Sequence, residues 1–563
     1  MGFLNVKTPY LFIFIPDLLD LLKKTNRFVY TFLGVKHIMA LPMIDFNRSK
    51  NLTRNFLFVL FFGLLFSSVS PPALATGSSA HLYGGFGPLH NWPIIPIAMM
   101  LMPDGRVFAY GTNETGAQGA KMNYAIWDPS LGTNNVAFTL LQNTTNTDIF
   151  CAGHSIIPAT GQALIVGGDA LVNGIRNYAN SDVNIFDPVT STLIRQPQQM
   201  AYKRWYATSV TSPIGEHIVL GGRNDKFFAG TPTKPATAAS YSPIPEVRAA
   251  DGTWRSLTNA SNDYAYGALG ASSWYYPRAW IDPRGKIFIL GHYDAAYKLD
   301  YSGIGTITRY QTTKPKSGRW ELPSVMFAPG KILSLRRNKT AVVVDINGNG
   351  DPTVTLTGAP SAERLYGSAT VLADGRVWVN GGSSGGNSLT GATLTSEIWN
   401  PATNSWTLAA SASTYRLYHS TSILLPDGSV MTGGGGAPGP LKQLNGEIYY
   451  PSYLYKKDGS GQFDYRPEIV AAPESMIGWN ESFSVESDEV INRVTLLRVG
   501  AATHNIDVEA RFFNLTIPSK GKIVTLKSPA NANIAPPGYY MLFVWNSAGV
   551  PSIARIIQIG NHL

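Results

Sequence analysis

The sequence predicts an all-β protein in which a ring of repeated strand groups precedes a smaller β-sandwich. Only 14% of the 563 residues are charged, whereas 55 are glycine and 11% are aromatic, a composition typical of β proteins with many tight turns. A strand–turn–strand–glycine pattern recurs along the chain with a period of roughly 50 residues. From about residue 466 this repeat stops, but short alternating strands continue, which indicates a separate domain.

Each copy of the repeat has an apolar strand, an Asp-Gly or related turn, a second apolar strand and then glycine. Glycine accepts a positive φ without a Cβ clash, so Asp-Gly between apolar runs indicates a hairpin. The turns lie at 103–105, 158–161, 213–215, 283–285, 329–330, 373–375 and 426–428. Copies of this kind predict a seven-bladed kelch-type β-propeller. Six blades are the alternative, because the copy at 329–330 lacks the glycine pair.

Three parts follow from this pattern. Residues 1–75 are an N-terminal extension with a signal peptide, 76–460 the propeller, and 461–563 an immunoglobulin-like β-sandwich. We expect residues 76–95 to close the ring by pairing with the last blade.

The N-terminal extension has the features of an export signal. Basic residues at 48–54 precede an apolar run at 56–66, and an A-x-A-type cleavage site follows at 73–75. We expect cleavage after Ala75 and a secreted or extracytoplasmic protein. An uncleaved membrane anchor is the alternative, although the run is short for a span of roughly 20 residues. Residues 1–38 are also apolar, which suggests Met39 or Met43 as the start.

The charge of the chain argues against nucleic acid as a partner. The net charge is +9, and much of it comes from residues 1–54, which hold eight Lys or Arg and three Asp. The remaining charge is weak and scattered, unlike a basic binding surface. The sequence shows no pattern of an oligomer interface, so we expect a monomer.

Chemically unusual residues occupy one position of the repeat. Seven residues before three of the turns lie Cys151, Tyr206 and His419, and Tyr418 precedes His419. Equivalent positions in a propeller form a ring around the central axis. We therefore expect these side chains at one end of the channel, where the innermost strands begin.

Each of these residues alone has an ordinary structural explanation. Tyr276 and Tyr366 share the register, so tyrosine here can be a packing preference. A lone cysteine is commonly a buried small hydrophobe, and a lone histidine is commonly satisfied within the core. However, Cys151 is the only cysteine of a chain expected to be exported, where it cannot form an intramolecular disulfide. The joint placement of these residues indicates a functional site.

Four segments together resemble the copper-radical oxidase family, which includes galactose oxidase and glyoxal oxidase. The resemblance covers roughly residues 80–563 in the same order. The segments are Phe150-Cys151-Ala152-Gly153, Arg204-Trp205-Tyr206-Ala207-Thr208, Arg416-Leu417-Tyr418-His419-Ser420, and Thr503-His504 followed by Arg511-Phe512.

The resemblance implies one copper ion, with Tyr206, Tyr418, His419 and His504 as ligands. It also implies a thioether between Tyr206 and Cys151, which forms a built-in radical cofactor. Imidazole and phenolate suit Cu(II) in a tetragonal site with an exchangeable position. The implied activity is oxidation of primary alcohols or aldehyde hydrates by O2, which yields H2O2, with Tyr418 as general base.

Some features of the family have no clear counterpart. Where the family usually has Gln before the arginine of the last segment, this chain has Ala510. For the stacking aromatic residue and the sugar-binding arginine of galactose oxidase, only Arg278, Arg364 and Trp205 are candidates. The alternative function is a catalytically silent secreted kelch propeller that binds carbohydrate or protein. Binding alone would not require all five of the residues implied at the copper site, which argues against it.

Overall fold

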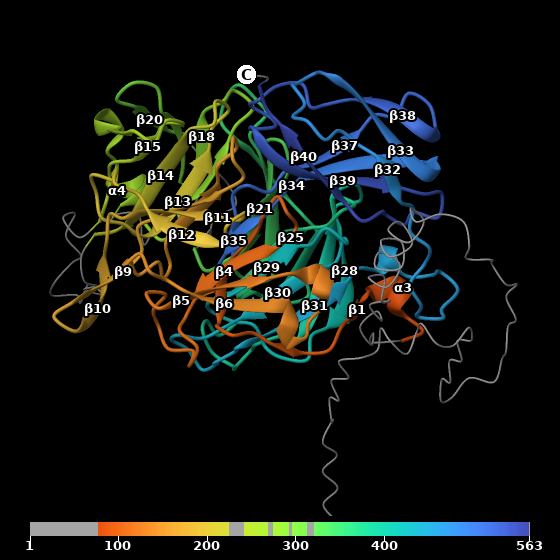
Figure 1. Ribbon diagram of the computed structural model, residues 1–563, viewed down its shortest axis with the longest axis horizontal. Helices are drawn as coiled ribbons and strands as arrows, with labels where there is room; N and C mark the ends of the chain where they lie inside the picture. The colour runs from red at the N-terminus through yellow and green to blue at the C-terminus, as the bar shows by residue number, and fades with distance from the viewer. Residues whose placement is uncertain (1–76, 225–240, 268–273, 292–294, 312–319, 562–563) are drawn as a thin grey trace, which may run out of the picture. The chain divides into compact units, whose positions relative to one another are not determined.

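The computed structural model describes residues 77–224, 241–267, 274–291, 295–311 and 320–561, all within one compact unit (Figure 1). The expected signal peptide and start site lie outside the described residues. Strands dominate; the α-helices described are the single turns α3 Ala80–Tyr83 and α4 Asp263–Tyr266. In the described part of the chain, no helix is both long and apolar enough to span a bilayer. The fold is therefore all-β, as predicted.

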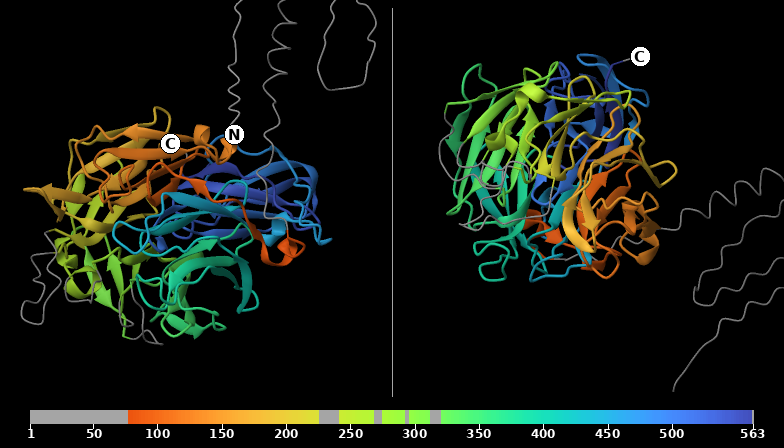
Figure 2. Two further views of the ribbon diagram at one scale, coloured as in Figure 1. Left: turned by 90° about the horizontal axis from the view of Figure 1, so that it is seen from below. Right: turned by 90° about the vertical axis from the view of Figure 1, so that its left-hand side faces the viewer.

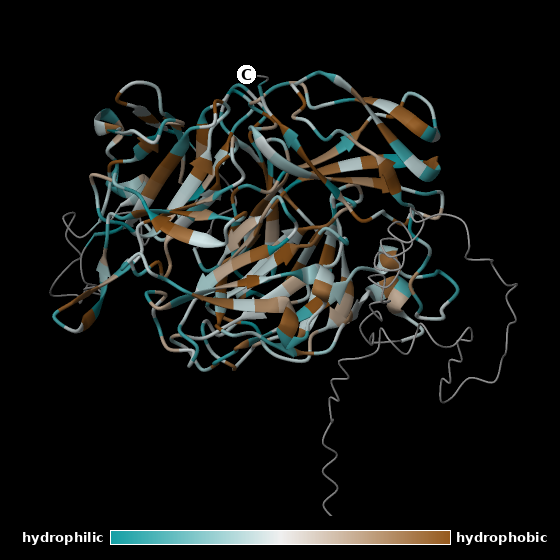
Figure 3. Cartoon of the chain, viewed as in Figure 1, coloured by the Kyte–Doolittle hydropathy of each residue, from teal (hydrophilic) through white to brown (hydrophobic). Residues whose placement is uncertain are grey.

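Antiparallel four-stranded units follow one another along the chain. One unit contains β17 Arg278–Ile281, β18 Ile287–Leu290, β19 Ala296–Asp300 and β20 Thr306–Arg309. Its two inner strands are entirely buried, whereas the outermost is largely exposed. This gradient arises because the inner strands have neighbours on both faces. Figure 3 shows the same trend, since most hydrophobic segments lie on strands and the loops are largely hydrophilic.

The remaining units repeat this order of strands. They are β3 Pro96–Leu101, β4 Val107–Gly111, β5 Asn123–Trp127 and β6 Phe138–Gln142; β7 Gly153–Ile156, β8 Ala163–Val166, β11 Val183–Asp187 and β12 Thr192–Arg195; β13 Trp205–Thr211, β14 His217–Arg223, β15 Glu246–Arg248 and β16 Trp254–Ser256; β21 Ser324–Ala328, β22 Lys331–Arg336, β23 Thr340–Asp345 and β24 Thr353–Leu356; β25 Leu365–Val371, β26 Val377–Ser383, β27 Thr395–Asn400 and β28 Ser405–Ser411; and β29 Ser420–Leu424, β30 Val430–Gly434 and β31 Asn445–Tyr450. They correspond to the predicted repeats. The number of blades stays a prediction.

The first strands of the described chain complete the last unit. β1 Gly85–Phe86 and β2 His90–Asn91 both pair antiparallel with β31, with Gly85 opposite Tyr450 and His90 opposite Gly446. The structure thus confirms that residues within 76–95 pair with the last repeat. A separate hairpin of β9 Asp169–Val172 and β10 Ile175–Ala179 extends from the β7–β12 unit (Figure 1).

Two further sheets form the C-terminal sandwich. One contains β32 Ile469–Ala471, β33 Ser482–Ile491 and β38 Gly521–Lys527; the other contains β37 Phe512–Leu515, β34 Arg493–Arg498, β39 Gly538–Trp545 and β40 Arg555–Ile559. Their inward-facing side chains share one apolar core. The predicted domain limits, 460 and 461 included, stay predictions.

A short hairpin from the C-terminal part joins the propeller. β35 Ala501–Thr503 pairs antiparallel with β3, and β36 Ile506–Asp507 pairs parallel with β21. The hairpin thus bridges two units into one ten-stranded sheet. Figures 1 and 2 show the blue C-terminal strands packed beside the propeller units. Residue 504, which the sequence singled out, lies at the hairpin turn.

Candidate metal centre

Five equivalent positions of the repeat have a left-handed backbone conformation. Cys151, Tyr206, Tyr276, Tyr366 and His419 have φ values of 53°, 69°, 39°, 62° and 67°. Positive φ is uncommon outside glycine and strains the backbone, so a series of such residues points to function. Each lies at or within two residues of the start of an innermost strand. We call these five residues the ring positions.

Backbone hydrogen bonds connect neighbouring ring positions. The amide of Tyr206 donates to the carbonyl of Cys151 at 3.0 Å, and the amide of Tyr276 donates to the carbonyl of Tyr206 at 2.8 Å. The left-handed conformation is therefore stabilised by contacts between adjacent units, and it turns the side chains toward a common centre.

The two remaining equivalent positions are Pro96 and Leu322. They belong to the units of β3 and β21, the strands that pair with the β35–β36 hairpin. His504 at the tip of this hairpin also has a positive φ, 55°. Where the repeat offers no polar side chain, a different part of the chain therefore supplies one.

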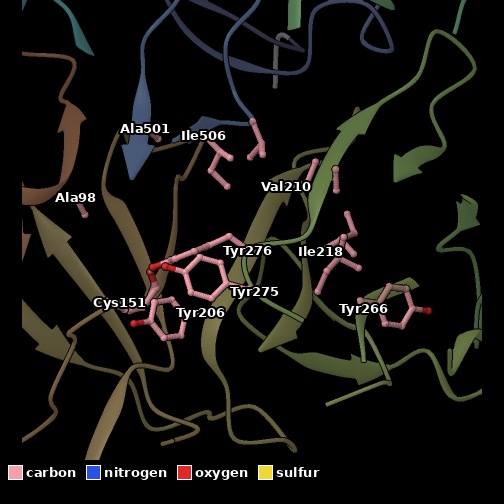
Figure 4. Close-up of a cluster of buried hydrophobic side chains, with 14 of the residues drawn as sticks. Ala98, Cys151, Tyr206, Val210, Ile218, Tyr266, Tyr275, Tyr276, Ala501 and Ile506 are labelled. Carbon is pink, nitrogen blue, oxygen red and sulfur yellow. The ribbon is translucent and has the colours of Figure 1, made fainter. Parts of the chain in front are cut away.

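The structure brings together all five residues singled out in the sequence. The Sγ of Cys151 lies 3.5 Å from Nε2 of His419 and 3.8 Å from Nε2 of His504, and these three atoms are within 4.8 Å of one another. The hydroxyls of Tyr206 and Tyr418 are 2.8 Å apart. Figure 4 shows Cys151 directly beside the ring of Tyr206.

The hydrogen bonds of the two histidines fix their tautomers. The Nδ1 of His419 lies 2.6 Å from the carbonyl of Gly436, which can only accept, so Nδ1 carries the proton. The Thr503 hydroxyl donates to the carbonyl of Ile97 at 3.1 Å and therefore accepts from Nδ1 of His504 at 2.7 Å. Both Nε2 atoms thus present a free lone pair to the centre, as metal-binding histidines do.

Burial keeps the candidate ligands neutral. It lowers the pKa of His419 to about 3 and places the pKa of His504 well below the ordinary value, so neither imidazole is protonated near neutral pH. Burial also raises the pKa of Tyr206, Tyr418 and the Cys151 thiol, so these groups keep their protons in the metal-free protein. Two imidazole nitrogens and two phenol oxygens form a donor set that fits copper.

Tyr275 is a residue of this centre that the sequence reasoning missed. Its ring stacks on that of Tyr206, with 4.3 Å between centroids and 23° between planes. Its hydroxyl donates to the Tyr418 hydroxyl at 2.8 Å. Trp205, a candidate from the sequence, packs against the Tyr206 ring at 4.4 Å. Tyr275 and Trp205 are thus the two rings whose centroids lie closest to that of Tyr206 among the described residues.

A signal for Tyr275 was present in the repeat. It precedes a ring position, as Tyr418 precedes His419. Phe150 and Trp205 stand in the same place, one residue before Cys151 and Tyr206. An aromatic residue therefore precedes four of the five ring positions, the exception being Tyr366, which follows Leu365.

A small pocket opens beside the candidate ligands. Its volume is about 10 Å³, enough for about one water molecule. Its lining combines aromatic rings with three candidate ligands and a few small or polar residues: Tyr275, Trp320, Tyr366, Leu417, Tyr418, His419, Ser420, His504 and Asn505. A molecule of this size in the pocket would lie against the metal position.

The two arginine candidates have structural partners. Arg364 is fully buried, pairs with Glu397 at 2.6 Å and donates to the carbonyl of Gly381 at 2.9 Å. Arg278 is also buried and donates to the Tyr276 carbonyl at 2.9 Å, to the Trp320 carbonyl and to the Asn505 side chain. Arg278 therefore orients the pocket wall.

The segment after His504 departs from the expected pattern at Ala510, which is buried. The preceding Glu509 accepts hydrogen bonds from the amide and hydroxyl of Thr211 and pairs with Arg498 at 2.7 Å. Arg511 donates to the carbonyl of Ile281. These contacts anchor the hairpin segment to the propeller.

Comparisons with known proteins find oxidases that are similar to this chain. Residues 466–559 match the family model "Galactose oxidase-like, Early set domain". A galactose oxidase of Gibberella zeae is 28% identical over 508 residues, which cover 84% of this chain and 70% of that protein. An aldehyde oxidase GLOX of Vitis pseudoreticulata is 24% identical over 468 residues, 73% of this chain and 82% of that protein.

A solved structure shares the fold. It is that of a fungal alcohol oxidase of the AA5 family in complex with copper. The match has a TM-score of 0.73 and 24% identity, and it covers 85% of this chain and 100% of the other.

Proposed function

Because this chain belongs to the copper-radical oxidase family, we propose that it oxidises primary alcohols or aldehyde hydrates with O2 and releases H2O2. The observation that carries the proposal is the convergence of two unprotonated Nε2 atoms and two tyrosine hydroxyls around the only cysteine. A galactose oxidase and an aldehyde oxidase among the relatives support both substrate classes.

One copper ion is the proposed metal, with Tyr206, Tyr418, His419 and His504 as its ligands. When bound, copper supplies one-electron redox chemistry next to the small pocket. The hydrogen bonds of Gly436 and Thr503 hold the imidazoles in the orientation that this role requires.

A thioether between Cys151 and Tyr206 is the proposed organic cofactor. Its formation breaks the S–H bond of Cys151 and a ring C–H bond of Tyr206, forms one C–S bond and reduces O2 to H2O2. The sulfur donates electron density into the ring and makes the ring easier to oxidise. This role accounts for a buried free cysteine within 4 Å of two histidines.

The two tyrosines have separate roles in the proposed reaction. The oxygen of Tyr418 takes the proton of the substrate hydroxyl as general base. Once cross-linked and oxidised, Tyr206 would take a hydrogen atom from the substrate carbon, and bound copper would supply the acceptor for the remaining electron. O2 then receives two electrons and two protons in total, so alcohol and O2 become aldehyde and H2O2. The Tyr275 hydroxyl, which donates to Tyr418, orients the base, and the aromatic pocket walls exclude bulk water.

The N-terminal signal supports export, so we propose that the protein acts outside the cytoplasm as a monomer. Its partners would be a small alcohol or aldehyde and O2.

The test is copper loading of protein produced without copper, followed by a peroxide assay on a panel of alcohols and aldehydes. We expect the intact mass to fall by two hydrogens and H2O2 to appear with at least one substrate class. Cys151→Ala should show neither the mass change nor substantial peroxide. Wild-type protein that keeps its full mass and produces no peroxide would instead support the silent binding propeller.

A further inference from the structure

The β9–β10 hairpin contacts the loop that carries Cys151 without contributing to the metal centre itself. β9 begins at Asp169, directly after the pair Gly167 and Gly168 that follows β8. The amide of Asp169 donates to the carbonyl of Phe150 at 3.1 Å, so the hairpin is joined to the residue before Cys151.

An irregularity in the hairpin turns one side chain inward. Ile175 pairs with Val172 but Tyr178 pairs with Ala170, so β10 has one more residue than β9 between these pairs. Asn177, within the extra stretch, has a φ of 76°. Such a β-bulge redirects a side chain and is common near active sites.

The redirected side chain is that of Arg176, which pairs with two buried carboxylates. Its Nη1 lies 2.7 Å from Asp148 and 3.3 Å from Asp169, whose side chains are 5% and 0% exposed. The guanidinium packs against Gly119, where a Cβ would come within 2.4 Å of Nη2. No other residue type fits at 119 without displacing the arginine.

The Asp148 carboxylate and the Asp169 backbone amide both hold the Cys151 loop. One oxygen of Asp148 accepts from the amides of Ala120 at 2.7 Å and Phe150 at 3.1 Å. Asn180 donates to the carbonyls of Asp148 and Asp169 at 3.2 and 2.8 Å. The loop is therefore fixed on both sides of the paired aspartates.

Burial of two carboxylates is costly unless a cation pairs with them. Without Arg176, Asp148 and Asp169 would repel each other or draw in water. The loop from 148 to 152 would then relax, and Cys151 would leave its strained left-handed conformation.

We propose that Arg176, through Asp148 and Asp169, is a positioning residue that holds Cys151 in the geometry needed for its bond to Tyr206. The inference rests on the proposed thioether. It gives the β9–β10 hairpin a role in the maturation of the cofactor, and none in binding copper or substrate.

The experiment follows maturation directly. Protein produced without copper is mixed with Cu(II) in air, and the free thiol is titrated after denaturation at successive times. We expect Arg176→Gln to lose its thiol roughly 10- to 100-fold more slowly than wild type, because small misplacement of reacting atoms has effects of this size. Arg176→Lys, which keeps the positive charge, should mature at an intermediate rate.

Anaerobic copper titration provides a second readout. We expect Arg176→Gln to bind Cu(II) with wild-type affinity, since the arginine contacts none of the proposed ligands; a general loss of structure would weaken it. Arg195→Gln is the matched control, because Arg195 has an exposed side chain and pairs with Asp182, just before β11. It should mature at the wild-type rate.

The outcomes separate the two proposals. Wild-type maturation kinetics in Arg176→Gln would overturn the positioning role and leave the proposed oxidase intact. Wild-type protein that retains its thiol indefinitely would overturn the thioether, and the positioning role with it.

Discussion

The ring positions and the β35–β36 hairpin deliver side chains to the same centre in different ways. The ring positions arise by repetition: each unit offers one residue at the start of its innermost strand, and five of them share a left-handed backbone. The hairpin arises once, outside the repeat, and enters between β3 and β21. His504 therefore reaches the centre where the repeat offers only Pro96 and Leu322.

This difference teaches how a symmetric scaffold acquires an asymmetric site. The repeat fixes backbone geometry at every ring position, and the chemistry depends on which side chain each unit places there. Tyr276 and Tyr366 share the geometry of Tyr206 without its proposed role. The four proposed ligands then come from three places: Tyr418 and His419 are adjacent, Tyr206 belongs to another unit, and His504 belongs to the hairpin.

The largest effect should follow from removal of the hairpin ligand. In His504→Ala we expect loss of bound copper and a fall in kcat of at least roughly 10³-fold. The fold should persist, because β35 and β36 are held by backbone pairing. Metal analysis and thermal melting measure the two effects. Full copper content in this variant would contradict the ligand role of the hairpin.

Cys151→Ala tests the ring position that is proposed to form the organic cofactor without binding copper. We expect copper to bind, because all four proposed ligands remain, but no loss of two hydrogens and roughly 10²-fold or greater loss of activity. Intact mass spectrometry and oxygen uptake measure these changes. An unchanged turnover rate would remove the thioether from the mechanism.

Thr503→Val tests the hydrogen bond that supports the proposed ligand of the hairpin, His504. The substitution removes the hydroxyl that accepts from Nδ1 of His504, and loss of such support typically weakens metal affinity roughly 10- to 100-fold. Thr503→Ser keeps the hydroxyl and should retain wild-type affinity. Equal affinities in the two variants would show that the imidazole needs no such partner.

The smallest effect should come from Tyr276→Phe at a ring position without a proposed role. The lost hydrogen bond to the Ala152 carbonyl is 3.3 Å long, and Tyr110 still donates to that carbonyl. We expect the free energy of unfolding to fall by about 1 kcal/mol or less, with kcat nearly unchanged. Urea unfolding and peroxide assays test this. A large loss of kcat would extend the chemistry to a further ring position.

The sequence predicted the part of the centre that repetition encodes. Counting back from each turn identified Cys151, Tyr206 and His419, because equivalent positions in a propeller must converge. Pairing of the first strands with the last unit followed from the same reasoning. The resemblance to a known family then added His504, which no count along the repeat could reach.

Other features depend on contacts that the sequence does not display. The role of Arg176 requires a bulge in β10 and a pair of aspartates 21 residues apart, 148 and 169. The stacking of Tyr275 on Tyr206 depends on how two neighbouring units pack. Tertiary contacts of this kind determine a side chain's direction, and local propensity does not encode them.

The pairing of β35 with β3 also has a consequence for biosynthesis. Proteins are made from the N-terminus, so β3 emerges some 400 residues before the strand that must lie against it. Nearly the whole polypeptide must therefore be synthesised before the last proposed copper ligand, His504, exists. An incomplete chain without His504 would lack one of the four proposed copper ligands. Only the complete chain would therefore reach the active form.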